Sequence, residues 1–329
     1  MLKALLRPAM IFIPFTLGVL CPGAAGSSFL IRWCLIAMFY LIALRIHAAD
    51  MRPRKWHWLL LLVNILIGIG SYTLFHFAGR EDLALAAFFV GITPTANAAP
   101  VVMSFLNGRI GYMVTGFAIT NLGISAALVL LLPLVTGNHT FVFVRDIVVS
   151  LLQVIALPLT AAFLTRKFYP PAEKWPGKCK MFSFSLWSCT LFIIASVASS
   201  FLRSNPQISK LVIVEFALIS LAICILNFSI GGLIVPHRIR RESSQLLGQK
   251  NTSFTLFMAL SFANPLAAMG PASYIFWHNL WNALQMFLYD RHRDQKSLPI
   301  HRKIQIRTVH ARKRRLKGLR KLRKKRNAA

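Results

Sequence analysis

The sequence predicts an all-α, polytopic membrane protein whose ten transmembrane helices form a 5+5 inverted repeat. Three observations support this fold class. The 329 residues are 56% apolar and only 14% charged, and the mean hydropathy is +0.59, whereas soluble domains carry about 25% charged residues. Ten apolar segments follow one another along the chain. Two of them are interrupted at matching positions in the two halves, which an ordinary soluble enzyme would not show.

Each of the ten segments meets or approaches the length of about 20 apolar residues that crosses the hydrocarbon core. The segments are roughly 6–22, 28–47, 56–78, 82–107, 110–135, 141–168, 180–202, 210–236, 243–263 and 265–289. Because backbone groups in lipid must bond internally, each intact segment is expected to be an α-helix. Arg32, at one end of the second segment, is expected to snorkel toward the interface.

Lysine and arginine in the short loops determine the expected orientation. With the N-terminus inside, the cytoplasmic segments before the C-terminal tail hold 14 of these residues, and the outer loops hold three. This bias predicts that both termini are cytoplasmic and supports an even number of spans. The sequence is therefore expected to form a multi-pass protein of the cell inner (plasma) membrane.

Residues 1–290 are expected to form the transmembrane body, with one repeat at about 1–138 and the other at about 139–290. Residues 291–329 are a basic tail that holds 17 of the 38 lysines and arginines. Because this segment is so highly charged, it cannot bury a core, and disorder or a frayed helix is expected. Anionic lipid is its expected contact. RNA is the alternative, but the tail has no aromatic residue to stack on bases, so no specific nucleic acid is expected.

The fourth and ninth segments are expected to be broken helices. The fourth contains Pro94 and Pro100, and each proline removes a backbone donor and disrupts the preceding turn. Hydroxyl and amide side chains lie beside these prolines, namely Thr93, Thr95 and Asn97. The ninth has six consecutive small or polar residues at 248–253, among them Gln249, Lys250 and Asn251. Polar residues at this depth are costly unless they line a cavity.

The two breaks occupy corresponding places in the two halves. Gly248 follows Gly91 by 157 positions, and in the next segments Asn279 follows Asn121 by 158. An offset of five helices, an odd number, places the halves in opposite orientations. Broken helices at matching positions of an inverted repeat point to a transporter binding site. The alternative is coincidence, because glycine and proline are common in transmembrane helices.

A broken helix exposes unpaired N–H groups at one half-helix end and unpaired C=O groups at the other. The N–H ends attract anions, and the C=O ends attract cations together with nearby amide and hydroxyl oxygens. Two such helices that cross would make one compact site for an anion and a cation. The residues expected to bind substrate or ion are Thr93, Thr95, Asn97, Thr120, Asn121, Gln249, Lys250, Asn251 and Asn279.

At these residues the sequence resembles the bile acid/sodium symporter family, over about residues 1–290. The resemblance rests on the proline-broken fourth segment with V-V-M-S-F-L-N-G-R after it, on G-Q-K-N in the ninth, and on P-A-S-Y-I-F-W-H-N-L in the tenth. It implies a two-part architecture, with a panel of helices 1, 2, 6 and 7 and a core of helices 3–5 and 8–10. It also implies that broken helices 4 and 9 cross in the core and that organic anions move by alternating access.

The sequence departs from the family where sodium would bind. In the family pattern E-x-x-x-Q-N on helix 9, Leu246 and Lys250 take the places of the Glu and the Gln, ahead of the matching Asn251. The family's Ser-Asn pair on helix 4 falls near Ala99-Pro100. Sodium is therefore a doubtful cofactor, and Lys250 is interpreted as a built-in cation at a former sodium position. The alternative is that the ninth span begins later, which would make Lys250 interfacial. The coupling ion is accordingly H⁺ or Na⁺, and no other cofactor or metal is expected.

The sequence thus predicts a secondary active transporter of a small organic anion, not an enzyme. One alternative is an intramembrane serine hydrolase that uses His278; Ser273 lies on the same predicted helix but about 140° around it, which argues against a dyad. Another alternative is a channel or a membrane sensor that does not transport. Covalent serine probes would favour the hydrolase, and saturable uptake would exclude the channel and the sensor.

Overall fold

The computed structural model describes residues 13–44, 51–96, 98–206 and 209–297, and this part of the chain is all-α. Five of its helical segments are long and apolar enough to cross a membrane: Lys55–Phe77, Ile110–Thr136, Phe141–Phe168, Met181–Ser204 and Leu211–Leu233. The protein is therefore a plausible polytopic membrane protein. Each of the other expected segments also contains helix, but these helices are shorter, interrupted or less apolar.

The first half of the chain begins with helix at residues 13–20 and the 3₁₀ helix η1 (Pro22–Ser27). Its α-helices are α2 (Leu30–Ala43), α3 (Lys55–Phe77), α4 (Glu81–Ile92), α5 (Ala99–Phe105) and α6 (Ile110–Thr136). The segment 82–107, predicted to be a broken helix, is thus the pair α4 and α5. Thr93 precedes Pro94 and takes the extended conformation (ψ 128°) that a residue before proline prefers, which ends α4.

The second half opens with α7 (Phe141–Leu151), the π-helical segment η3 (Leu152–Ala156) and α8 (Leu157–Phe168). Short turns follow, η4 (Pro170–Lys174) and α9 (Trp175–Lys178), and then α10 (Lys180–Ser204), α11 (Lys210–Leu233), η5 (His237–Ile239), α12 (Arg240–Gly248), α13 (Thr252–Phe262) and α14 (Pro265–Ser297). The predicted broken helix at 243–263 is the pair α12 and α13. The π-helical segment lies just before Pro158, which has no N–H to continue the regular α-helical bonding.

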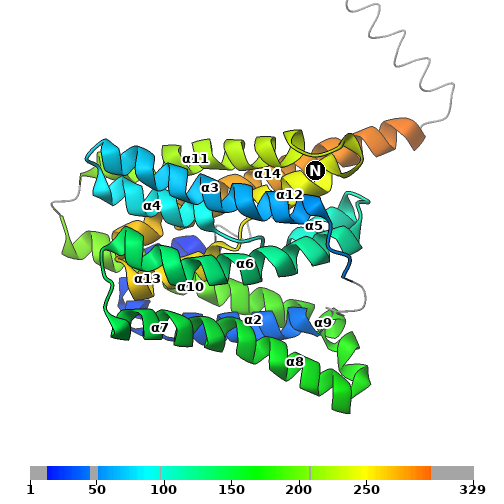
Figure 1. The fold of residues 1–329 in the computed structure, drawn as a ribbon, viewed down its shortest axis with the longest axis horizontal. Coiled ribbons are helices and arrows are strands. Elements are labelled where there is room, and N and C mark those ends of the chain that lie inside the picture. Colours follow the sequence, from blue (N-terminus) through cyan, green and yellow to red (C-terminus); the bar gives the residue numbers. More distant parts are fainter. Residues whose placement is uncertain (1–12, 45–50, 97, 207–208, 298–329) are drawn as a thin grey trace, which may run out of the picture. The chain divides into compact units, whose positions relative to one another are not determined.

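The helices pack as two groups (Figure 1). In one group, here called the panel group, α2 contacts η3, α8 and α10, and α10 contacts η1. In the other, the core group, α3 contacts α4 and α6, α11 contacts α4 and α12, and α12 contacts α3, α5 and α6. The groups meet where α13 contacts α2 and α10, and where α6 contacts α7. Buried apolar side chains such as Phe39, Ile124 and Phe254 form one cluster that includes both groups.

Close backbone approaches hold the long helices against the broken ones. A Cβ on Gly91 of α4 would lie 2.7 Å from the Cα of Gly68 of α3. In the second half, a Cβ on Gly231 of α11 would lie 2.7 Å from the carbonyl oxygen of Ser243 of α12. Each half therefore packs its long helix tightly on the first part of its broken helix, by means of a glycine.

The chain divides into two compact units, Met1–Ala283 and Leu284–Ala329. The division falls inside α14, seven residues before the predicted end of the body at residue 290. Most of the predicted basic tail, residues 298–329, lies outside the described residues.

Candidate functional site

The two helix breaks are hydrogen-bonded to each other. The backbone N–H of Ala96 donates to the carbonyl of Gln249 at 2.8 Å, and the N–H of Asn251 donates to the carbonyl of Pro94 at 2.8 Å. These bonds make Thr95 and Lys250 partners in a short antiparallel bridge. These bonds pair some of the backbone N–H and C=O groups that lose their intrahelical partners at the two breaks. The structure therefore brings the two predicted break segments to one place.

Lys250 is the most unusual side chain of this junction. It is 1% exposed, and its Nζ donates to the side-chain oxygen of Asn64 on α3 and to the carbonyl of Gly91 on α4, the latter at 3.2 Å. Among the described residues, no carboxylate forms an ion pair with it. The Nζ of Lys250 is thus buried inside the protein and held by neutral oxygen atoms.

The carbonyl ends of α4 and α12 both receive donors at the junction. On α4, the carbonyl of Gly91 accepts from Lys250, and the carbonyl of Phe89 accepts from the Thr93 hydroxyl at 2.5 Å. On α12, the carbonyl of Leu246 accepts from the Thr95 hydroxyl at 2.6 Å, and that of Gly248 accepts from the Tyr274 hydroxyl at 2.7 Å. A cation at the C-terminal end of α4 is favoured by the helix dipole.

The polar pair on α6 also reaches the junction. The Thr120 hydroxyl donates to the Thr95 hydroxyl at 2.9 Å, and the Asn121 amide donates to the Thr95 carbonyl at 3.0 Å. Both side chains are buried. The structure therefore brings together Thr93, Thr95, Thr120, Asn121, Gln249, Lys250 and Asn251 among the predicted site residues.

Two predicted site residues are not part of this cluster. Asn97 lies outside the described residues. Asn279 bonds within its own helix, where its amide donates to the carbonyl of Ile275 at 2.7 Å. The side chain of α14 that reaches the junction is Tyr274, five residues earlier, whose hydroxyl donates to the carbonyl of Gly248.

Three buried polar atoms at the junction have no hydrogen-bond partner among the described residues. They are the side-chain oxygens of Asn121 and Gln249 and the side-chain nitrogen of Asn251. Buried polar groups are almost always hydrogen-bonded, so each exception needs an explanation. Gln249 and Asn251 belong to the second break, and Asn121 is bonded to Thr95 of the first. A polar ligand at this junction would supply the missing hydrogen-bond partners.

Sequence reasoning missed Asn64 and Tyr274. Asn64 is the amide in the apolar run L-L-L-L-V-N-I-L-I-G of α3, and Asn227 is its counterpart in I-C-I-L-N-F-S-I-G of α11, 163 positions later. Both are buried. Asn64 donates to the carbonyl of Thr93 at the end of α4 at 3.0 Å. Asn227 donates at 3.4 Å to the hydroxyl of Tyr274 on α14, and that hydroxyl donates to the carbonyl of Gly248 at the end of α12. A single amide in each apolar span was the signal available.

The oxygens around Lys250 do not fit a sodium ion at the same position. A sodium ion is bound by oxygen atoms, and here the Asn64 side-chain oxygen and the Gly91 carbonyl are bonded to the ammonium.

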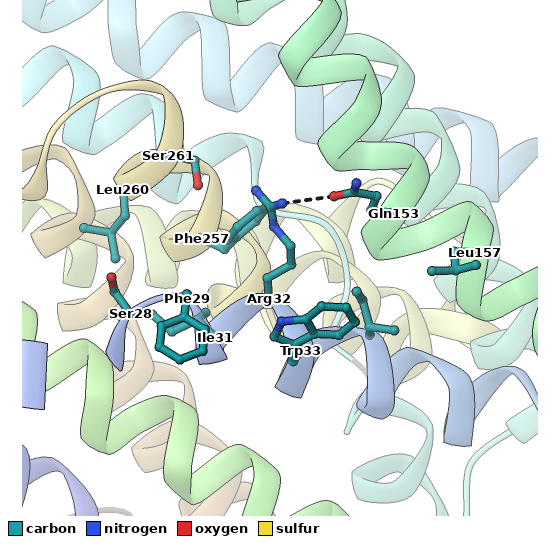
Figure 2. Close-up of a pocket in the computed structure, with 11 residues that line it drawn as sticks. Ser28, Phe29, Ile31, Arg32, Trp33, Gln153, Leu157, Phe257, Leu260 and Ser261 are labelled. Atoms are coloured by element: carbon teal, nitrogen blue, oxygen red, sulfur yellow. Dashed lines mark hydrogen bonds between the residues drawn. The ribbon is translucent and has the colours of Figure 1, made fainter. Parts of the chain in front are cut away.

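A pocket lies where the panel group meets the core group (Figure 2). It has a volume of about 490 Å³ and is lined by residues of α2, of the η3–α8 region and of α13. Arg32 lies in this pocket, where its guanidinium donates to the side-chain oxygen of Gln153 at 3.0 Å. Arg32 is half-buried, and its guanidinium also lies over the Phe257 ring at 5.2 Å from the ring centre. The expectation that Arg32 snorkels toward the interface stays a prediction.

His278 lies in a packed environment. Its ring is 6% exposed and makes an edge contact with Tyr274, with 5.4 Å between the ring centroids. Its Nδ1 has no hydrogen-bond partner within the described part of the chain.

No protein-family model matches this sequence, and no curated protein matches it.

Proposed function

We propose that this protein is a secondary active transporter that carries a small organic anion across the inner membrane by alternating access, without a requirement for sodium. The observation that carries the proposal is the ammonium of Lys250, which is buried at the junction of two broken helices. Charged residues inside a membrane protein usually mark a substrate or ion pathway, and paired broken helices mark transporter binding sites.

Electrostatics explains why a lysine would serve this function. An anion in the middle of a membrane needs a compensating charge, because its surroundings screen it poorly. Half-helix ends contribute only about half a unit of charge each. A fixed ammonium completes the neutralisation, which is the part that sodium plays in the bile acid/sodium symporter family that the sequence resembles. Among the described residues Lys250 is bonded to neutral oxygens, and no carboxylate forms an ion pair with it.

A lysine also offers a route to proton coupling. A desolvated ammonium can release its proton. In the proposed cycle, Nζ releases this proton in the empty carrier and regains it when the anion binds, so that one proton accompanies each substrate. The proton and the anion then cross together, with H⁺ as the coupling ion.

The packing of the helices supports alternating access. The panel group and the core group each pack within themselves, and α13, which contacts α4 of the core group, also contacts α2 and α10 of the panel group. This grouping has the two-part form that the family resemblance implies. Rocking of one group against the other would move the helix junction between the two sides of the membrane.

Counterflow in proteoliposomes tests the proposal. Vesicles that contain the purified protein are loaded with one unlabelled organic anion at a time, and uptake of the same labelled anion is measured with and without sodium. We expect saturable counterflow for at least one anion, of equal size in both conditions. Full dependence on sodium in the wild-type protein would refute the sodium-free mechanism, and absence of counterflow for the whole panel would refute transport.

Two lysine variants separate the proposed role from general effects. Lys250→Gln is expected to abolish sodium-free uptake, and any uptake that remains is expected to depend on sodium. Lys178→Gln, in the exposed α9 turn, is the matched control and should transport normally. Normal sodium-free uptake by Lys250→Gln would show that the lysine does not supply the charge.

A further inference from the structure

Five buried polar atoms of the second half have no hydrogen-bond partner within the described part of the chain. They belong to α11, to α14, and to α12 with the residue that follows it. Each of their residues is at most 6% exposed. The atoms are Asn227 Oδ1, Gln245 Oε1, Gln249 Oε1, His278 Nδ1 and Asn282 Nδ2. A buried donor or acceptor without a partner carries its full desolvation penalty, so this set calls for a common explanation.

The residues form a continuous polar strip between α12 and α14. On α14, Tyr274, His278 and Asn282 follow one another at intervals of four, which places them on one face of the helix. The rings of Tyr274 and His278 are in edge contact, with 5.4 Å between their centroids. The Gln245 amide of α12 donates to the side-chain oxygen of Asn282 at 2.8 Å. This set, here called the polar seam, consists of Asn227, Gln245, Gln249, Tyr274, His278 and Asn282.

The unpaired atoms of the polar seam include both acceptors and donors. The side-chain oxygens of Asn227, Gln245 and Gln249 can only accept, whereas the Asn282 nitrogen can only donate. A cation would satisfy the oxygens alone, and an anion would satisfy the nitrogen alone. Water donates and accepts, and a buried water usually bonds to about three such groups. The chemistry of the set therefore fits water molecules.

One end of the polar seam reaches the Lys250 junction. The Tyr274 hydroxyl donates at 2.7 Å to the carbonyl of Gly248, two residues before Lys250. Cys224 of α11 is 4% exposed. Its thiol hydrogen-bonds to the Tyr274 hydroxyl and interacts electrostatically with the Lys250 Nζ. A hydroxyl and a thiol thus lie between the seam and the buried lysine.

The other end of the polar seam leads toward the cytoplasm in the predicted orientation. The first residue of α12, Arg240, lies in a segment predicted to be cytoplasmic, and Gln245 lies between it and the junction. Glu242, three positions before Gln245, is 6% exposed and accepts from the Arg109 N–H at 3.1 Å. Along this route the titratable groups are Glu242 of α12, His278 and Tyr274 of α14, Cys224 of α11 and Lys250.

We propose that the polar seam holds a chain of water molecules through which Lys250 exchanges its proton with the cytoplasm, and that His278 is a member of this chain. The inference rests on the proposed function, because it gives the route of the proton that Lys250 releases and regains. Histidines in such chains are common in proton-coupled transporters.

The transfer conserves the proton at every step. On release, one N–H bond of the Lys250 ammonium breaks, Nζ becomes a neutral amine, and the proton passes to a water molecule. At His278 one ring nitrogen takes up a proton and the other releases one. The proton finally leaves to bulk water at the cytoplasmic end of α12. Uptake follows the same steps in reverse.

Isotope exchange at the Cys224 thiol tests the water chain without a transported substrate. In the full-length protein in detergent, with the other four cysteines replaced by alanine, the infrared S–H band reports Cys224 alone. Its conversion to the S–D band is followed after transfer to D₂O. The matched control keeps only Cys34, which is also buried. We expect Cys224 to exchange about tenfold faster or more, because buried groups with water access exchange without unfolding. Equal or slower exchange at Cys224 would overturn the proposal.

Two substitutions locate the route relative to Cys224. Gln245→Leu removes an amide of the polar seam on the cytoplasmic side and should slow the exchange about tenfold or more. Ser220→Ala is the matched control on the other side, one turn earlier in α11. It removes a buried hydrogen bond, from the Ser220 hydroxyl to the Gly270 carbonyl at 2.8 Å, and should leave the rate unchanged. Equal effects of both would refute the route. If Gln245→Leu does not fold, Asn282→Leu replaces it.

Net uptake and counterflow separate the role of His278 from a structural one. Counterflow exchanges anion for anion and needs no release of the Lys250 proton, whereas uptake driven by a pH gradient needs one release in each cycle. The probe is 2-naphthalenesulfonate, a strong acid that stays ionised and does not itself carry protons through lipid. His278→Gln should leave its counterflow unchanged and reduce gradient-driven uptake about tenfold or more. An equal loss of both activities, or normal gradient-driven uptake, would remove His278 from the chain.

The outcomes distinguish the proton route from the transport proposal. Fast exchange at Cys224 that depends on Gln245, in a protein without counterflow, would leave the water chain standing and remove the transport function. Normal counterflow with slow exchange at Cys224 would do the reverse. If the wild-type protein does not carry 2-naphthalenesulfonate, exchange at Cys224 in His278→Leu decides, and an unchanged rate in that variant refutes the role of His278.

Discussion

The side chain of Asn64 joins the two helix breaks: its oxygen accepts from the Lys250 ammonium, and its nitrogen donates to the carbonyl of Thr93 at 3.0 Å. Lys250 and Thr93 belong to opposite halves of the chain, and Asn64 is separated from Lys250 by 186 positions. One amide on α3 therefore holds the buried cation and also stabilises the end of α4.

This arrangement predicts a strong coupling between Asn64 and Lys250. Asn64→Leu should destabilise the protein by about 2 kcal/mol, because a hydrogen bond to a buried charge is lost and the ammonium keeps only the Gly91 carbonyl. In a Lys250→Met background, where the charge is absent, the same substitution should cost clearly less. Thermal unfolding in detergent of the wild-type protein, the two single variants and the double variant measures this double-mutant cycle. Strictly additive effects on stability would contradict the coupling.

A second prediction concerns the glycine contact between α3 and α4. Gly68→Ala should lower stability by about 1–3 kcal/mol, because a Cβ there would meet Ile92 at 2.9 Å in a packed core. Gly70→Ala, on the same helix, is the matched control: a Cβ at Gly70 has no heavy atom within 4 Å, and alanine favours helix over glycine. The Tm of Gly70→Ala should equal or exceed that of the wild-type protein. A similar loss of stability in both variants would show that α3 and α4 pack less closely at Gly68 than the structure indicates.

The third prediction is the orientation in the membrane. Residues 138 and 204 should be outside, and residue 175 and the C-terminal tail should be cytoplasmic. Two contacts join positions assigned to the same side: Arg80 pairs with Glu215 at 2.6 Å, and the Arg109 N–H donates to Glu242 at 3.1 Å. Labelling of single cysteines at 138, 175 and 204 with an impermeant thiol reagent shows on which side of the membrane each position lies. A reporter fused to the tail shows the same for the C-terminus. A tail on the outer side would break the inverted-repeat argument.

The fourth prediction concerns the basic tail. Removal of residues from Lys296 onward should leave folding and transport intact. The predicted apolar segments end before residue 290, and the tail is too highly charged to bury a core. Size-exclusion profiles and counterflow of the truncated and full-length proteins provide the comparison. Loss of membrane insertion in the truncated protein would instead show that the basic residues help to establish topology.

The breaks were predictable because their causes are local. Pro94 forces the residue before it out of the helical conformation, and this effect is visible in any sequence that contains it. The run of polar residues around Lys250 interrupts an apolar segment in the same local way. The sequence therefore identified both break segments and most of the side chains that meet there, including Thr95 and Lys250.

The partners of these residues were harder to predict. The offset of 158 positions from Asn121 led to Asn279, whereas Tyr274 is the side chain that reaches the carbonyl of Gly248. In a helix that is apolar on nearly every side, the pattern of residues does not show which face meets the neighbouring helix. An error of one residue turns a side chain by about 100°, which is enough to remove it from the site.

The sequence by itself determined the helical segments, the position of both breaks and the predicted orientation, because these depend on composition, proline stereochemistry and loop charge. Tertiary structure decided which distant polar groups meet. Asn64 and Lys250 are 186 positions apart, and Arg32 and Gln153 are 121 apart. Contacts over such distances depend on how whole helices pack and turn about their axes, and that packing is a property of the assembled core, which no local segment encodes.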